Sequence, residues 1–369
     1  MINSFYTKFA KLVVHYSIEI KKGDRVLIEG PSFAKELFQA IYLEILSAGG
    51  HPLVMPELEG ISELLLKNAS EEQLLFLHNT IKSTNKDFDS IITIGGEFNT
   101  RKLSLVDPKR IAKQRGSPDR TAFMQEFEER MSKKLLKWIG IPFPCHAYAQ
   151  EASMDLFSYS DFVEKALLLD KENPTDEWTK VQIKQDKIVQ KLNGVKIIQI
   201  IGEDTELELS VEGRTWENCC GKLNLPDGEV YTGPIETHTN GHIRFTYPGI
   251  YAGREIENIY LEFKDGEIIN ATADKGEDLL KEILEIENAK RIGEFAIGTN
   301  YGITQFTKNM LFDEKMGGTI HLALGMGFQE TGSKNKCAIH WDILKDMRHK
   351  GSKILVDGHV IYEEGYWKI

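Results

Sequence analysis

The chain of 369 residues carries 45 lysines and arginines against 56 aspartates and glutamates, so its formal net charge is −11 at pH 7. This acidic balance argues against a nucleic-acid-binding protein, because such proteins gain most of their affinity by neutralising phosphates. A composition that is 41% hydrophobic and 27% charged is typical of a folded globular protein. No apolar run approaches the ~18 residues that a membrane-spanning helix needs. We therefore expect about two folded domains that bind neither nucleic acid nor membrane.

Buried strands alternate with amphipathic helices in the first half of the chain. Short apolar strands are predicted at 24–30, 52–55 and 90–94, and helices at 120–137 and 150–193. Such alternation is typical of a parallel sheet covered by helices. Residues 1–190 are therefore predicted to form an α/β N-terminal domain with a mainly parallel sheet. The turns after the strands carry no glycine-rich phosphate-binding motif, which gives no support to nucleotide binding.

The apolar period changes to two from about residue 195, as expected for strands with one buried face. Two of the predicted strands are joined by a turn at 264–266, and one helix is expected at 276–288. The dipeptide Asn240–Gly241 predicts a two-residue hairpin turn, which would leave His238 and His242 exposed on either side. The remainder, 191–369, is therefore predicted to be a strand-rich α+β C-terminal domain that carries the catalytic site.

The four cysteines of the chain are too few and too scattered for a zinc ribbon. Adjacent cysteines such as Cys219 and Cys220 rarely form a disulfide with each other, because the geometry is strained. We expect reduced, mostly buried thiols in a cytoplasmic protein. A nucleophilic pair of Cys145 and His146 is disfavoured, because adjacent residues on a strand point to opposite faces.

A few ionisable residues stand within apolar strands of the second half, where an unpaired polar group is costly to bury. His340 and Asp342 share one face of the run 338–344, because side chains alternate along a strand. His321 and Glu294 are each the only ionisable residue of their strands, and Glu229 opens another strand. Two imidazoles and three carboxylates suit a pair of divalent ions. Each signal is weak alone, since a histidine in an apolar strand is more often a hydrogen-bonded core residue.

Four motifs follow one another in the second half: Gly-Glu-Val-Tyr-Thr-x-Pro at 228–234, Gly-Glu-Phe-Ala-Ile-Gly-Thr-Asn at 293–300, His-Leu-Ala-Leu-Gly at 321–325 and Ala-Ile-His-Trp-Asp at 338–342. Together they resemble the thermophilic-aminopeptidase family of metallopeptidases, the group of aminopeptidase T and aminopeptidase S. Looser similarity is present in the first half, at 22–27 and 99–104. The resemblance implies a cytoplasmic homodimer that removes N-terminal amino acids from peptides. It also implies that the metal ligands are the five residues already singled out, Glu229, Glu294, His321, His340 and Asp342.

One position departs from the family pattern. The family usually has a tyrosine seven residues after the first ligand histidine, where this chain has Phe328. A phenol there would donate a hydrogen bond to the oxyanion or pass a proton, and losing such a donor costs on the order of 10²–10³ in rate. We expect that Phe328 does not contact the metals. Either another group or the metals themselves replace the phenol, or the chain is a slow or altered member of the family.

The resemblance and the ligand set predict a metal-dependent aminopeptidase that uses a two-metal-activated water. Two divalent ions of zinc, cobalt, manganese or magnesium would lower the pKa of the water, and one ion would bind the free α-amine of the substrate. Glu294, or the non-ligand residue Glu330, would pass the proton to the leaving amine. The alternatives are a related metal-dependent amidase or dipeptidase and a catalytically attenuated, peptide-binding member of the family.

Overall fold

The computed structural model describes residues 4–368, which separate into two compact units. The first unit extends to Thr175 and includes the short segment Lys222–Leu225, and the second consists of Asp176–Gly221 and the chain from Pro226 onward. The division falls at the start of the helix α10 (Pro174–Leu192), whereas the boundary expected near residue 190 falls at its end. The two domains expected from the sequence remain a prediction.

A four-stranded parallel sheet lies at the centre of the described part of the first unit, with the strand order β2-β1-β3-β4. Its strands are β1 (Arg25–Pro31), β2 (His51–Glu57), β3 (Ser90–Gly95) and β4 (Lys137–Pro142). The helices are α1 (Ser4–Lys11), the π-helix η1 (Leu12–Ser17), α2 (Lys35–Ser47), α3 (Ile61–Asn68), α4 (Glu71–Leu75), α5 (Asn79–Asp87), α6 (Pro108–Arg115), α7 (Pro118–Ser132), α8 (His146–Glu151) and α9 (Leu156–Ala166). The mainly parallel sheet predicted for this half is confirmed.

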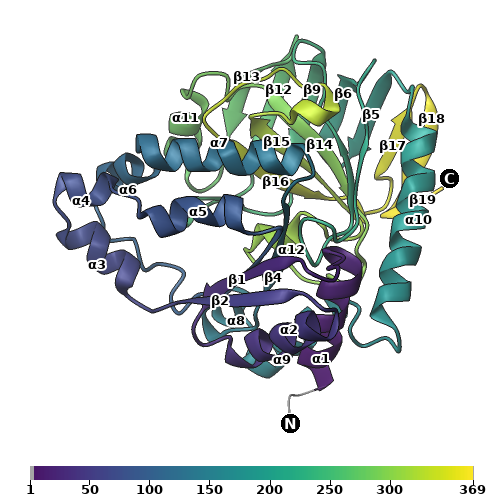
Figure 1. Ribbon diagram of the computed structural model, residues 1–369. Helices are drawn as coiled ribbons and strands as arrows, with labels where there is room; N and C mark the ends of the chain where they lie inside the picture. The colour runs from purple at the N-terminus through teal and green to yellow at the C-terminus, as the bar shows by residue number, and fades with distance from the viewer. Residues whose placement is uncertain (1–3, 369) are drawn as a thin grey trace. The chain divides into compact units, whose positions relative to one another are not determined.

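Helices bury both faces of this sheet, which explains why its strands are apolar on both sides. Leu27 in the central strand β1 packs in one cluster with the α7 side chains Phe127 and Met131. The neighbouring side chains Val26 and Ile28 point to the opposite face and are also fully buried. Figure 1 shows α2 and α7 on opposite sides of the sheet.

Two antiparallel sheets make up most of the second unit, in the teal to yellow part of Figure 1. The larger sheet has the order β13-β12-β9-β6-β5-β17-β18-β19 and the smaller has the order β16-β15-β14-β8-β7, while β10 and β11 form a separate ribbon. The strands are β5 (Ile197–Gly202), β6 (Thr205–Ser210), β7 (Glu217–Cys219), β8 (Glu229–Thr232), β9 (Thr239–Arg244), β10 (Gly249–Tyr251), β11 (Arg254–Ile256), β12 (Tyr260–Lys264), β13 (Glu267–Thr272), β14 (Ile292–Gly298), β15 (Thr319–Gly325), β16 (His340–Asp346), β17 (Lys353–Val356), β18 (His359–Glu363) and β19 (Tyr366–Trp367). The helices after α10 are α11 (Glu277–Leu284), α12 (Met310–Asp313) and the short 3-10 helix η2 (Gln329–Thr331). No helix in the described chain is both long and apolar enough to cross a lipid bilayer.

The two sheets of the second unit share one hydrophobic core. Ile198 and Leu207 of the larger sheet belong to the same buried cluster as Phe295, Ile320 and Trp341 of the smaller one. Since side chains alternate along a strand, the neighbours of these last three residues point to the other face of the smaller sheet. The strand-rich α+β architecture predicted here is confirmed, and the face away from the core carries the ionisable residues.

The hairpin predicted at Asn240–Gly241 is wrong, because both residues lie inside β9, which pairs with β6 on one side and β12 on the other. Gly241 is needed for a close approach of two strands, since a Cβ there would lie 2.1 Å from the carbonyl oxygen of Glu206. His242 is consequently half-buried in the sheet and not exposed beside a turn. The turn predicted at 264–266 does connect β12 to β13.

Candidate metal centre

The five predicted metal ligands lie on one face of the smaller sheet. Three positions paired with them or adjacent to them on that face are small: Gly298 is opposite Glu229, Ala323 is opposite Glu294, and Ala296 is opposite His321. Because these small residues project little from the sheet, they leave space in which the longer ligand side chains can converge. The strands contribute as follows: Glu229 from β8, Glu294 from β14, His321 from β15, and His340 and Asp342 from β16.

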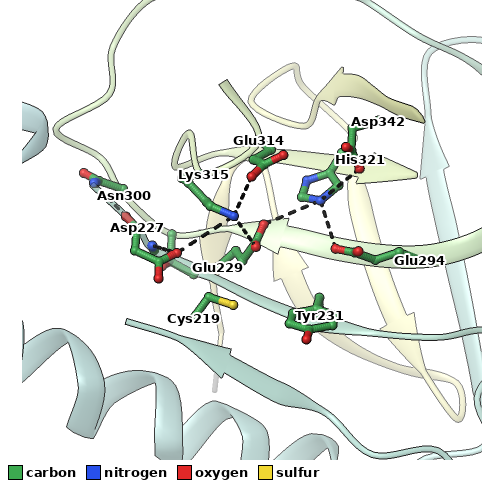
Figure 2. A network of polar contacts seen from close by, with 12 residues as sticks. Cys219, Asp227, Glu229, Tyr231, Glu294, Asn300, Glu314, Lys315, His321 and Asp342 are labelled. Carbon is green, nitrogen blue, oxygen red and sulfur yellow. Dashed lines mark hydrogen bonds and ion pairs between the residues drawn. The ribbon is translucent and has the colours of Figure 1, made fainter. Parts of the chain in front are cut away.

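Glu294 lies between the two histidines and joins two groups of ligand atoms. Its Oε1 is 3.2 Å from the Nε2 atom of His321, and its Oε2 is 3.4 Å from the Nε2 atom of His340. Glu229 Oε2 lies 3.5 Å from His321 Nε2, and Asp342 Oδ1 lies 3.3 Å from His340 Nε2. One group consists of Glu229, Glu294 and His321, and the other consists of Glu294, His340 and Asp342. Within each group the ligand atoms are at most 4.8 Å apart. Figure 2 shows four of the five side chains turned toward one another. The cluster therefore offers two adjacent cation positions that share one carboxylate.

Two buried oxygens without hydrogen-bond donors in the described part of the chain indicate whether the residues of this cluster suit a metal ion. Glu229 Oε2 and Asp342 Oδ1 accept no well-formed hydrogen bond from the described residues. A buried carboxylate oxygen without a partner is costly, and both oxygens face imidazole nitrogens instead. Carboxylate oxygen and imidazole nitrogen are the ligands that zinc, cobalt and manganese take in proteins. The residues present fit a divalent metal ion.

The electrostatics of the metal-free cluster follow from burial and close pairing. Burial raises the pKa of Glu229 to about 7. Burial also acts to raise the pKa of Glu294, but hydrogen bonds from His321 and His340 outweigh it and lower that pKa to about 2. Burial opposes the charged form of both histidines, yet the carboxylates raise the pKa of His321 to about 9 and that of His340 to about 11. Without metal the imidazoles therefore hold protons that a bound cation would displace.

A backbone contact fixes the orientation of His340. Its Nδ1 lies 2.8 Å from the carbonyl oxygen of Met326, to which it donates, so Nε2 is the nitrogen that faces the cluster and would ligate a cation once its own proton is displaced. The Met326 carbonyl is placed by a close approach of the chain, because a Cβ on Gly293 would lie only 2.2 Å from that oxygen. A β-bulge at Gly293 directly precedes Glu294. Bulges commonly accompany active sites, and this one links the placement of Glu294 to that of His340.

Phe328 and Glu330 border the cluster. The Phe328 ring is 4.8 Å from the ring of His340 and 5.6 Å from the ring of Tyr231, between centroids. The hydroxyl of Tyr231 donates to Glu330 Oε1 at 3.0 Å, and Glu330 is exposed on η2. A hydrocarbon ring offers no metal ligand, so Phe328 can act here only through shape and contact.

Sequence analysis missed a buried ammonium group beside the ligands. Lys315 Nζ forms ion pairs with Glu229 and, at 2.7 Å, with Glu314 Oε1, and lies 3.9 Å from Asp227 Oδ1 (Figure 2). Only 4% of the Lys315 side chain is exposed. In the sequence Lys315 belongs to the charged run 313–315, which is typical of a solvated loop. Apolar residues on both sides of the run are the one signal that pointed to burial.

The residues that sequence analysis set aside lie outside the cluster. His238 is exposed, and His242 lies against Tyr260 in the larger sheet. Cys145 is buried whereas the adjacent His146 is exposed, so they form no nucleophile pair. All four cysteines are free thiols.

A buried carboxylate–histidine cluster on a sheet is characteristic of metal-dependent enzymes. The sequence model of the thermophilic metalloprotease (M29) family matches residues 3–367, and the chain belongs to this family. The resemblance stated above is thereby confirmed, and membership in a metalloprotease family implies a divalent metal.

Known relatives cover almost the whole chain. Aminopeptidase 2 of Geobacillus stearothermophilus is 25% identical over 351 residues, which cover 87% of this chain and 83% of the relative. Aminopeptidase AmpS of Bacillus subtilis is 24% identical over 97% of each chain. The solved structure of wild-type AmpT from Thermus thermophilus matches with a TM-score of 0.85 at 20% identity, over 99% of each chain. This structural match confirms the predicted fold class.

Proposed function

We propose that the chain is a metal-dependent aminopeptidase, which removes N-terminal amino acids from peptides at the cluster of Glu229, Glu294, His321, His340 and Asp342. The observation that carries this proposal is the position of Glu294, whose two oxygens face the Nε2 atoms of two different histidines. A carboxylate that turns one oxygen toward each position can bridge a pair of adjacent cations and offset their charge. The names of the relatives support a peptide with a free N-terminus as substrate. The family resemblance extends the proposal to a homodimer in the cytoplasm.

Each ligand has a defined part in this proposal. Glu229, Glu294 and His321 would hold one divalent ion, and Glu294, His340 and Asp342 would hold the other. Bound ions of this kind lower the pKa of a water toward neutrality and polarise a carbonyl group. His340 turns Nε2 toward the cluster for this purpose, because its Nδ1–H is donated to a backbone carbonyl. The ligand set accepts several divalent ions, including zinc, cobalt, manganese and magnesium.

For proton transfer to the leaving amine we favour Glu330 over Glu294. Both oxygens of Glu294 face histidines, so using it as a proton carrier would disturb both cation positions. Glu330 is exposed at the border of the cluster and is held by the hydroxyl of Tyr231. A carboxylate that is oriented in this way and reaches solvent can take up and release a proton.

Metal analysis of the purified chain beside a His340→Ala variant tests the proposal. We expect the wild-type chain to bind two divalent ions, and the variant to lose most of this metal together with hydrolysis of aminoacyl-anilides. His242→Ala is the matched control, since this histidine lies in the larger sheet, outside the cluster. It should keep both metal and activity.

Substrates with an acetylated N-terminus separate the proposed activity from that of a general amidase. An aminopeptidase should cleave the free aminoacyl-anilide and leave the acetylated one intact, because the free α-amine is part of what it recognises. Equal cleavage of both would favour a metal-dependent amidase. If the metal content of His340→Ala equals that of the wild-type chain, the cluster is not the metal site and the proposal fails.

A further inference from the structure

A third group of possible ligand atoms lies beside the two described above. It consists of Cys219 Sγ and carboxylate oxygens of Asp227 and Glu229, all within 4.8 Å of one another. The group shares Glu229 with the first cation position, just as the two cation positions share Glu294. A thiol and two carboxylates would suit a zinc ion by ligand type alone. The contacts of this third group nevertheless differ from those of the other two.

The oxygens of the third group already have partners. Asp227 Oδ1 accepts from the backbone N–H of Gly228 at 2.9 Å, and its Oδ2 accepts from that of Gly221 at 2.8 Å. Glu229 Oε1 accepts from the ammonium group of Lys315, which also lies 3.9 Å from Asp227 Oδ1. In contrast, Glu229 Oε2, on the side of His321, accepts no hydrogen bond from the described residues. The two oxygens of Glu229 therefore face two different cation positions, and one of these holds an ammonium group.

Lys315 is held in place by its surroundings. Its side chain is 4% exposed, and Glu314 Oε1 lies 2.7 Å from the same Nζ atom on a further side. Figure 2 shows the ammonium group between Asp227, Glu229 and Glu314. Withdrawing it would leave buried carboxylates without a counter-charge, which is strongly unfavourable. A metal ion at this position would have to displace a whole buried lysine side chain with its ion pairs, whereas on the histidines it would displace only protons.

We propose that Lys315 is a positioning residue that serves as a resident cation. Its ammonium group fills the Cys219–Asp227–Glu229 group and binds Glu229 Oε1, so that only Oε2 is left to ligate metal. Glu229 is consequently a one-oxygen ligand, and the chain binds two divalent ions and not three. The inference rests on the proposed function, because it takes the other two groups to be the metal positions.

Titration of the metal-free chain with Co²⁺ tests this inference, because a bound thiolate gives a sulfur-to-cobalt charge-transfer band in the near ultraviolet. The wild-type chain should bind two equivalents without a band from Cys219. Lys315→Met should bind a third equivalent and show the band, and a second substitution, Cys219→Ser, should remove both. Lys315→Arg keeps the positive charge and should behave as the wild-type chain does.

Two outcomes would overturn the inference. In the first, Lys315→Met binds two equivalents at the wild-type affinity and shows no thiolate band. In the second, the wild-type chain itself shows a band that Cys219→Ser removes, a comparison that needs no variant of Lys315 and holds even where Lys315→Met does not fold. Failure of the proposed function gives a different result, because His340→Ala would then bind as much Co²⁺ as the wild-type chain.

Discussion

The residue at which this chain departs from its family pattern, Phe328, lies in an aromatic border of the candidate site. Its ring is between the rings of His340 and Tyr231. The border does contain one phenol, but that of Tyr231 comes from β8 and is hydrogen-bonded to Glu330. The hydroxyl that the family resemblance led us to expect at position 328 is therefore absent, while a second hydroxyl, that of Tyr231, lies nearby and donates to the carboxylate of Glu330.

Restoring the hydroxyl with Phe328→Tyr is expected to raise kcat by up to about 10²-fold, because a single donor to the oxyanion contributes on that order. Metal content should not change, since no ligand is altered. Steady-state kinetics on an aminoacyl-anilide, with metal analysis of the same sample, measure both quantities. Phe306→Tyr is the control, because that ring stacks on Tyr247 at 5.0 Å, outside the ligand cluster. Equal kcat values for Phe328→Tyr and the wild-type chain would show that the phenol is dispensable here.

At the scale of elements, the bulge before Glu294 couples two strands of the site. Gly293 brings β14 so close to the end of β15 that a Cβ would lie 2.2 Å from the Met326 oxygen and 2.5 Å from the Gly325 oxygen. Both of these oxygens belong to the backbone, so they cannot move aside by a change of side-chain rotamer. The Met326 carbonyl in turn receives the Nδ1–H of His340. A side chain at position 293 would therefore disturb a ligand on β14 and the orientation of one on β16 together.

Gly293→Ala is accordingly expected to weaken metal binding and to lower the free energy of unfolding by about 1–3 kcal/mol, the usual cost of an overpacked site. Isothermal titration with Co²⁺ and chemical denaturation of the metal-free chain measure the two effects. Gly95→Ala is the matched control, because a Cβ there would lie in ordinary contact, 3.5 Å from the carbonyl oxygen of Ile141. Wild-type metal affinity in Gly293→Ala would show that the bulge does not position the site.

Alternation along strands was enough to predict which face of β16 holds His340 and Asp342, since this rule needs no knowledge of the fold. It could not show that β8 pairs with β14, and β14 with β15, in the register that brings Glu229 to His321, and there the family motifs supplied the link. The burial of Lys315 was not predicted, because a charged run in a loop has no periodicity that indicates burial. The hairpin prediction at Asn240–Gly241 was wrong because the same dipeptide can mark a tight turn or a strand in which glycine permits close packing.

At the scale of the whole molecule, protons and the proposed metal ions compete for the histidines and carboxylates of the cluster. The free energy of unfolding of the metal-free chain therefore depends on pH in a defined direction. The pKa of His321 is about 9 in the metal-free fold, against an ordinary value of 6.5. The stabilisation from its protonated form is complete below about pH 6.5 and is lost as the pH rises through 9. The shift corresponds to roughly 3 kcal/mol. Burial of Glu229, whose pKa is about 7 against an ordinary value of 4.5, adds a loss in the same direction at lower pH, between about 4.5 and 7.

The metal-free chain should therefore lose stability between about pH 6.5 and 9, while metal affinity rises because fewer protons compete. We expect the difference in Tm between metal-loaded and chelator-treated protein to widen across this range. Thermal unfolding in a series of buffers measures it. His321→Gln serves as the control, because it removes one of the two titrating imidazoles and should make the dependence shallower, while His340, whose pKa is about 11, keeps the remainder. A Tm difference that stays constant from pH 6.5 to 9 would contradict this account.

The order of the ligand-bearing strands along the chain also matters during synthesis. Glu229, Glu294 and His321 are translated first, and His340 and Asp342 follow later, on the edge strand β16 of the smaller sheet. A nascent chain can thus complete only one of the two proposed cation positions before residue 342 has been translated. On the proposed function, a fragment that ends before residue 340 would lack the second cation position and should not hydrolyse peptides.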